Sequence, residues 1–105
     1  MPAPPILTDE QRQAALKKAA EARRVRAELK EKLKMGSVSV DELFRLSDRD
    51  EIVGKMKVVA ALESLPGVGK VKARRTMEQI GISESRRLRG LGGQQRRALR
   101  ETFPS

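Results

Sequence analysis

The feature that most constrains the fold is an uninterrupted run, residues 9–34, that contains neither glycine nor proline. The run is rich in Ala, Lys, Arg, Glu and Leu, which all have high helix propensity. Thr8 can cap its N-terminus, Gln11 completes a capping-box pattern, and Gly36 supplies a stop. The sequence therefore predicts a single helix roughly 40 Å long, at 1.5 Å per residue.

The apolar face of this predicted helix is uneven along its length. Val25, Leu29 and Leu33 recur every four residues, a stripe that can pack on a core. Upstream, the same face is mostly alanine, which buries little area. We expect the second half of the helix to dock, and the first half to project from the domain and to fray.

The rest of the chain reads as short helices separated by turns. No segment shows sustained alternation of apolar and polar residues, so no strand is expected. The expected fold class is all-α, with a flexible lead over residues 1–7, a long basic helix over 8–36 and a compact helical domain over 37–105. The predicted short helices start at Ser39, at Ser47 or Asp48 (with a bend at Gly54), at Lys57, after the glycine run near residue 69 and at Gln94, and a short turn or helix starts at Ser83.

Within these helices the apolar residues predict which side faces the core. Pro66 ends the helix that runs from Lys57 to Ser64, because the residue before a proline is pushed out of the helical region. Gly81 is a plausible C-terminal cap for the helix that ends at Ile80. The predicted inward-facing residues are Val40, Leu43, Phe44, Leu46, Val58, Ala61, Leu62, Leu65, Val71, Ala73, Met77, Ile80, Ala98, Leu99 and Phe103.

The charge of the chain is strongly positive and unevenly placed. The net charge is +9, from 23 Lys and Arg against 14 Asp and Glu. Residues 65–105 carry 10 basic and 3 acidic residues, a local charge of +7. A domain this basic usually binds a polyanion, so the C-terminal segment is the expected binding face and the N-terminal helix is a second candidate. The alternative is a basic protein whose charge serves solubility alone.

Several other functions are excluded or disfavoured by composition. The chain has no Cys and no His, which removes disulfides, thiolate metal sites and the commonest general base. Two Phe and no Trp or Tyr leave almost nothing on which single-stranded bases could stack, so a duplex is the favoured target. No signal peptide and no membrane-spanning run is recognised, and we expect a soluble intracellular protein with no membrane partner.

The strongest local motif is Leu-Pro-Gly-Val-Gly-Lys at residues 65–70, at the mouth of a predicted helix. Glycines two residues apart allow a tight turn with positive φ and a close approach of the backbone to a phosphate. The free N–H groups and the dipole of the following helix then favour the phosphate charge. The alternative is an ordinary turn between helices. The residues predicted to bind here are Gly67, Val68 (through its main chain, with an inward side chain), Gly69, Lys70 and Lys72.

A second basic cluster comprises Arg86, Arg87 and Arg89, interrupted by Leu88. Three guanidiniums within four residues suit phosphates or a minor groove. On a helix, Arg86 and Arg87 would point about 100° apart and serve different roles, while Leu88 would anchor the segment. At least one of the arginines is also expected to cap a preceding main-chain carbonyl.

Other basic residues are weaker candidates for the same surface. Arg74 lies on the helix that follows the glycine run and is included in the predicted binding set. The lesser candidates are Lys55, Lys57, Arg75 and Arg24, and the residues expected to be surface charge alone are Arg96, Arg97 and Arg100.

The glycine run resembles the hairpin of helix-hairpin-helix and helix-two-turns-helix proteins, which bind duplex backbones. With residues 50–58, 61–72, 81–92 and the opening Leu7-Thr-Asp-Glu-Gln-Arg12, nearly the whole chain resembles actinobacterial integration host factor. The resemblance implies a helix-two-turns-helix DNA-binding domain and a nucleoid-associated role in the cytoplasm. It also implies DNA bending or compaction, support of phage integration, and DNA contact by the Arg-Arg-x-Arg-Gly motif. We expect a monomer whose partners are double-stranded DNA and, in recombination, phage integrase–DNA complexes.

Catalysis is not expected, although related folds occur in DNA glycosylases. Helix-hairpin-helix glycosylases place a catalytic Asp after the glycine loop, and no Asp occurs between Lys70 and Ser105. A glycosylase family that uses an N-terminal proline, for which Pro2 would stand, also needs a β-domain and metal ligands that this chain lacks. We therefore expect no catalytic residue, no metal and no cofactor. The alternatives left open are binding of structured RNA, as in a ribosomal small-subunit family, and a protein–protein adaptor.

Overall fold

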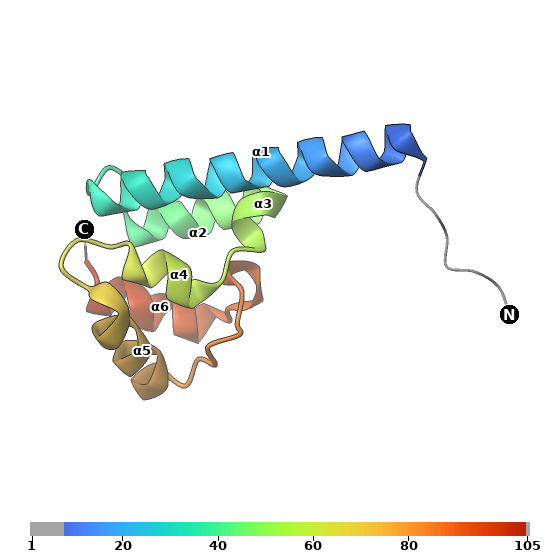
Figure 1. The fold of residues 1–105 in the computed structure, drawn as a ribbon. Helices are drawn as coiled ribbons and strands as arrows, with labels where there is room; N and C mark the ends of the chain where they lie inside the picture. Colours follow the sequence, from blue (N-terminus) through green and yellow to red (C-terminus); the bar gives the residue numbers. More distant parts are fainter. Residues whose placement is uncertain (1–7, 105) are drawn as a thin grey trace, which may run out of the picture.

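A computed structural model describes residues 8–104 and consists of one long helix lying across a group of short helices (Figure 1). The long helix is α1 (Asp9–Lys34), and within residues 8–104 the only β-structure is one isolated antiparallel bridge. The all-α prediction is confirmed, and the predicted flexible lead over residues 1–7 lies outside the described residues. The remaining elements are α2 (Val40–Arg49), α3 (Glu51–Gly54), α4 (Val58–Glu63), α5 (Gly69–Ile80), the 3₁₀ turn η1 (Leu88–Gly90) and α6 (Gly93–Thr102).

Both ends of α1 carry the signals that the sequence predicts. The Thr8 hydroxyl accepts from the Gln11 N–H at 3.1 Å, and the Gln11 Oε1 accepts from the Thr8 N–H at 3.0 Å. At the other end, Gly36 takes φ +75°, and the Ser37 N–H donates to the Lys32 carbonyl at 2.9 Å. This closing geometry needs a left-handed residue, which glycine supplies at little cost.

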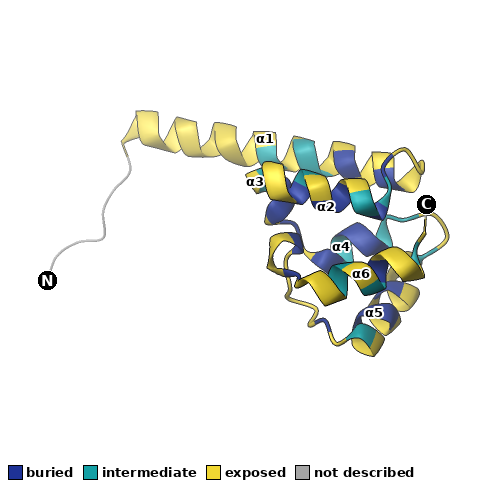
Figure 2. Ribbon diagram, turned by 180° about the vertical axis from the view of Figure 1, so that it is seen from behind, coloured by how far each residue is buried: buried dark blue, intermediate teal, exposed yellow. Residues whose placement is uncertain are grey.

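The two halves of α1 differ in burial, as predicted. Leu33 is fully buried, Leu29 is 5% exposed, and Val25 packs partly buried against the same core. Residues 8–21 are all exposed, and this half of α1 projects beyond the other helices (Figure 2). Fraying of the projecting half and the proposed division of the chain at residue 36 stay predictions. The burial of Leu29 and Leu33 shows that the second half of α1 is part of the core.

A single hydrophobic core joins all the helices. α1 lies over α2 and α3, α4 and α5 pack against each other as a hairpin, and α6 lies behind α4 in the view of Figure 1. The largest fully buried side chains come from five of these helices and from η1. They are Phe44, Leu33, Leu43, Leu62, Met77, Leu88, Leu99 and Val58. Among residues 8–104, no helix is both long and apolar enough to cross a membrane.

The prediction for the start of α3 is wrong by two to three residues. Asp50 caps this helix, since its Oδ1 accepts from the Ile52 N–H at 2.8 Å. Ser47 is instead buried inside α2, where its hydroxyl donates to the Phe44 carbonyl at 2.7 Å. α3 ends at Gly54, where a bend is predicted, but φ is not positive there, and a Cβ at this position would lie 2.8 Å from the Ser47 carbonyl oxygen. Glycine is therefore required at this position so that α3 can pack closely on α2.

The predicted buried face of α5 is correct except at Val71. Ala73 and Met77 are buried and Ile80 is half-buried, as predicted, and Thr76 joins them. Val71 is 72% exposed. Residues three or four apart share a helix face, whereas Val71 precedes Ala73 by two positions and so points away from the core. Residue type alone places Val71 in the core, whereas the helical period places it outside.

Candidate nucleic-acid interface

The hairpin loop, Leu65–Lys70, joins α4 to α5 through two left-handed glycines. Gly67 has φ +71° and Gly69 has φ +70°, and a Cβ at either would meet nothing within 4 Å. The need for glycine here is therefore conformational rather than a matter of space. Val68 lies between them, half-buried against the core, and its N–H donates to the Leu65 carbonyl at 3.2 Å. The predicted inward position of Val68 is confirmed, and its packing against the core holds the loop in place.

The N-terminus of α5 faces outward without a side-chain cap. In α1 and α2, the hydroxyls of Thr8 and Ser39 accept hydrogen bonds from N–H groups of the first turn, whereas no side chain does so at α5. Uncapped N–H groups and the helix dipole together favour an anion at this position. Lys70 and Lys72 are exposed on the same first turn and add positive charge.

The arginine segment, Arg86–Arg89, is extended at Arg86 and Arg87 and enters the 3₁₀ turn η1 at Leu88, so the two adjacent arginines do not lie on a helix. The Arg86 carbonyl accepts from the Val58 N–H at 2.9 Å, and the Leu88 N–H donates to the Met56 carbonyl at 2.9 Å. Arg87 has φ −99° and ψ 156°. The prediction that Arg86 and Arg87 diverge by a helical 100° is therefore wrong. The predicted anchor is confirmed, because Leu88 is fully buried.

Contacts with neighbouring main chain hold two of these arginines in place. The Arg86 Nη1 donates to the Gly90 carbonyl at 3.2 Å, so this arginine does bind a carbonyl, but one that follows it and not a preceding one as predicted. Arg89 runs across α3 so closely that a Cβ at residue 54, which is glycine, would lie 3.3 Å from the Arg89 Cβ. All three arginines are exposed, and none takes part in an ion pair within residues 8–104. Their charges therefore remain available to an anion.

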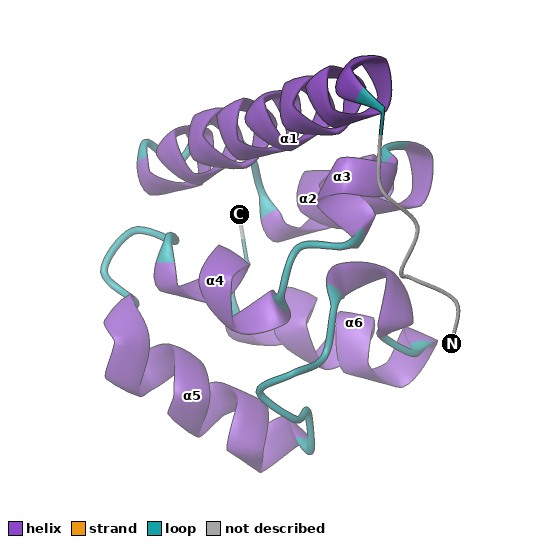
Figure 3. Cartoon of the chain, turned by 45° about the vertical axis from the view of Figure 1, so that its right-hand side comes forward, coloured by secondary structure: helices purple, strands orange, loops and turns teal. Residues whose placement is uncertain are grey.

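The hairpin loop and the arginine segment lie at opposite ends of α4. Arg87 pairs with Lys57, directly before α4, and the hairpin loop follows α4 (Figure 3). A six-residue helix spans about 9 Å, so a short rigid helix separates the two basic segments. Such an arrangement can hold two points of one extended polyanion.

The weaker predicted candidates have mixed surroundings. Arg74 Nε lies 3.4 Å from Glu84 Oε1, and Lys55 Nζ lies 2.9 Å from Glu51 Oε1. The hydrogen bond from Lys55 is the main cause that lowers the pKa of Glu51. The nearby charges of Arg89 and Lys18 lower it further, by smaller amounts. The other three candidates, Lys57, Arg75 and Arg24, are exposed and form no ion pair within residues 8–104, and Arg24 lies on α1 beside Lys17, Ala20 and Glu21.

Two basic residues that the sequence did not single out lie close to the hairpin loop. Lys30 and Lys34 of α1 line an open groove whose other wall includes Gly67 and Gly69. The signal that could have identified them is their spacing, since residues four apart share a helix face.

Arg96 is not surface charge, contrary to the prediction. Its side chain is 16% exposed, and its Nη1 and Nη2 donate to the two carboxylate oxygens of Asp48 at 2.9 and 2.8 Å. Its guanidinium also lies over the Phe44 ring, 5.3 Å from the centroid. Arg100 lies 5.5 Å from the same centroid and pairs with Asp41 at 3.1 Å. Arg96 and Arg100 therefore bind α6 to α2, and of the three predicted surface arginines Arg97 alone is left without such a partner in the described part of the chain.

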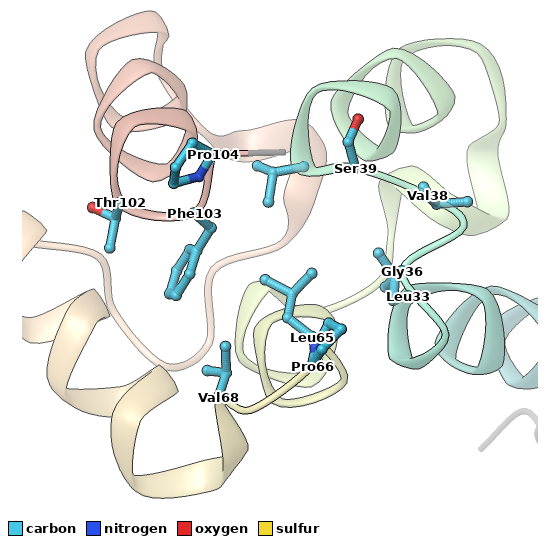
Figure 4. Close-up of a pocket in the computed structure, with 11 residues that line it drawn as sticks. Leu33, Gly36, Val38, Ser39, Leu65, Pro66, Val68, Thr102, Phe103 and Pro104 are labelled. Carbon is cyan, nitrogen blue, oxygen red and sulfur yellow. The ribbon is translucent and has the colours of Figure 1, made fainter.

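The other hollow near the hairpin loop is apolar. Leu65 and Val68 line it together with Leu33 and Phe103, and none of its lining residues is charged (Figure 4). It therefore cannot neutralise a phosphate. Within residues 8–104, no group of three His, Cys, Asp or Glu residues is placed to hold a metal ion.

Comparison with known proteins gives consistent matches over nearly the whole chain. Residues 33–103 match the family described as "S13-like H2TH domain". Integration host factor of Mycobacterium tuberculosis is 57% identical over 101 residues, 96% of this chain and 96% of that protein. Integration host factor of Mycolicibacterium smegmatis is 58% identical over 99 residues, 94% of each chain, and that of Streptomyces coelicolor is 56% identical over 101 residues, 96% of this chain and 94% of that protein.

A solved structure is similar in both fold and sequence. It is described as "Structure of sIHF bound to an 8bp palindromic DNA", and its TM-score with this chain is 0.81. The two are 54% identical, and the match covers 83% of this chain and 98% of that one.

Proposed function

The chain belongs to the integration host factor family of actinobacteria, and from this membership and its two basic segments we propose that it binds the backbone of double-stranded DNA. The observation that carries the proposal is the placement of the hairpin loop and the arginine segment at opposite ends of α4. One segment offers main-chain N–H groups and the other offers guanidiniums, and both are good donors to phosphate oxygens. The solved relative, whose description names an 8bp palindromic DNA, supports the same partner.

The proposed contacts bind phosphates in two groups. Gly67, Val68 and Gly69 supply the loop, Lys70, Lys72 and Arg74 add charge beside it, and Arg86, Arg87 and Arg89 hold the second group. Lys55, Lys57 and Arg75 lie near these segments as secondary contacts. Because phosphate contacts carry no sequence information directly, we expect weak sequence preference.

Two fixed points of contact on one rigid domain allow the duplex between them to bend. Bending a site of 20–30 base pairs costs of order 1–6 kcal/mol, which additional contacts offset. The proposed role is therefore architectural and has no catalytic step. It is that of a monomer in the cytoplasmic nucleoid that bends or compacts DNA and supports site-specific recombination, such as phage integration with integrase–DNA complexes.

The test is the salt dependence of binding to a duplex of about 25 base pairs. About six phosphate contacts give a log-log slope of affinity against salt near −5. A slope near zero would contradict an electrostatic backbone contact and favour a protein–protein adaptor.

Binding of structured RNA is the second candidate, because the glycine hairpin and the basic character of the chain also resemble those of a ribosomal small-subunit protein family. Competition between duplex DNA and duplex RNA of equal length separates the two. We expect DNA to compete more strongly, since A-form RNA presents its phosphates across a different groove geometry.

A further inference from the structure

The charges on α1 are sorted onto two different faces. Positions 12, 16, 19, 23, 26, 30 and 34 recur every three or four residues, so they lie along one side of the helix. That side contains five basic residues, one leucine and one alanine, and no acidic residue. We call its basic residues the basic stripe: Arg12, Arg23, Arg26, Lys30 and Lys34.

A side of α1 roughly 140° around the helix from the basic stripe provides the contrast. Positions 10, 17, 21, 24, 28 and 31 also recur at helical spacing, and four of these six residues are acidic. We call this the mixed face, and it includes Lys17 and Arg24 as its basic members. The positive charge of α1 is therefore concentrated on the basic stripe.

The basic stripe leads to the hairpin loop. Lys30 and Lys34, at its C-terminal end, line the groove shared with Gly67 and Gly69. Glu31 and Glu63 also line this groove, but neither forms an ion pair with Lys30 or Lys34 among residues 8–104. An anion held at the loop would therefore meet these two lysines next.

The remaining members of the basic stripe extend away from the loop along the projecting half of α1. Arg12 and Arg23 are exposed, Arg26 is half-buried, and none of the three is in an ion pair within the described residues. From Arg12 to Lys34 the stripe spans roughly 33 Å at 1.5 Å per residue. One turn of a duplex, about ten base pairs, is about 34 Å long, so the stripe is as long as one turn and can meet phosphates where the two backbones cross it.

We propose that the basic stripe of α1 is a third DNA-contacting surface, which binds phosphates of the same duplex beyond those held at the hairpin loop. This rests on the proposed function, and it explains why the helix continues past the core with a face free of acidic residues. It assigns the contact to Arg12 and Arg23 rather than to Arg24.

The test compares two charge-matched double variants in the exposed half of α1. Arg12→Gln with Arg23→Gln alters the basic stripe, and Lys17→Gln with Arg24→Gln alters the mixed face. Both remove two positive charges and both retain a good helix former. Circular dichroism and thermal unfolding of the full chain check that each variant keeps its helix content.

On a duplex of about 25 base pairs, we expect the affinity of the basic-stripe variant to be about tenfold lower than that of the parent protein. We also expect the magnitude of its log-log slope of affinity against salt to be smaller by about two. The mixed-face variant should stay within about twofold of the parent protein. On a duplex of about 10 base pairs, the loss from the basic-stripe variant should be much smaller, because few phosphates remain beyond the hairpin loop.

Equal losses from the two variants would overturn the proposal, because the effect would then be net charge alone. Equal losses of the basic-stripe variant on both duplex lengths would also overturn it, since the contact would not extend along the same duplex. No loss from either variant would leave the proposed function standing without the third surface. Failure of the parent protein to bind any duplex would instead refute the proposed function itself.

Discussion

The hairpin loop and the arginine segment present positive groups at the two ends of α4 by different physical means. The hairpin loop offers main-chain N–H groups, and its shape depends on two residues with positive φ. The arginine segment offers side chains, and its shape depends on hydrogen bonds to Val58 and Met56 and on the burial of Leu88. The first surface is therefore encoded locally, while the second needs the rest of the fold in order to exist.

The largest effect should follow from removing side chains that bind directly. Arg86→Ala with Arg87→Ala removes two charge-assisted contacts worth about 1.5–3 kcal/mol each, so duplex affinity should fall by about a hundredfold or more on every sequence. Arg49→Ala with Arg97→Ala removes two exposed arginines elsewhere and is the matched control. Fluorescence anisotropy measures both. If the two variants lost affinity equally while both stayed folded, the arginine segment would not be a specific contact.

A smaller effect is expected at the hairpin loop, where only conformation changes. Gly69→Ala adds a methyl group that meets nothing, but it imposes a left-handed φ that costs about 1–2 kcal/mol. The free energy of unfolding should fall by that amount and duplex affinity by about tenfold. The control is Gly93→Ala, where a methyl group also has free space but φ is not positive. Denaturant titration should find the control as stable as the parent or more stable, and equal destabilisation would contradict the conformational argument.

Affinity for a duplex should rise when Arg74 is released from its ion pair with Glu84. Glu84 lies 3.4 Å from Arg74, and both side chains are largely exposed. Such pairs contribute at most about 1 kcal/mol, so Glu84→Gln should tighten duplex binding by about two- to threefold. Glu78→Gln removes one exposed negative charge from the same helix and should have a smaller effect. A larger gain from Glu78→Gln would show that Arg74 is not the group being released.

The smallest effect concerns stability alone and comes from an arginine that the fold uses internally. The hydrogen bonds from Arg96 are the main cause that lowers the pKa of Asp48. A carboxyl whose folded-state pKa lies below its unfolded value near 3.9 stabilises the fold above that pH, and the contribution is lost as the pH falls through the folded-state pKa. Chemical unfolding should therefore find Asp48→Asn less stable than the parent at pH 7, with the difference shrinking below about pH 4. A difference that stays constant from pH 7 to pH 2 would contradict this assignment.

The features encoded locally were the ones that could be predicted. The capping box at Thr8, the positive φ at Gly36 and Gly81 and the hairpin glycines each depend on a few neighbouring residues. Helical spacing also predicted the docking of Leu29 and Leu33. The long helix and the hairpin therefore follow from the sequence almost directly.

The features that escaped prediction depend on residues far apart in the chain. Arg96 reads as surface charge until Asp48 and Phe44 are placed beside it. The extended form of Arg87 follows from pairing with Lys57, thirty residues earlier. Val71 was assigned to the core by residue type, although its position relative to Ala73 argues against burial. The tertiary structure therefore decides which arginines of a basic chain are free to bind a ligand.

The most direct test of the central claim is a map of backbone amide chemical shifts as a duplex of about 25 base pairs is added to the full chain. The account predicts that the largest changes occur at residues 67–72 and 86–89 together, at the same protein-to-duplex ratio. Amides on the exposed sides of α2 and α6 should change little. Large changes on α2 and α6, with residues 67–72 and 86–89 unaffected, would contradict the account.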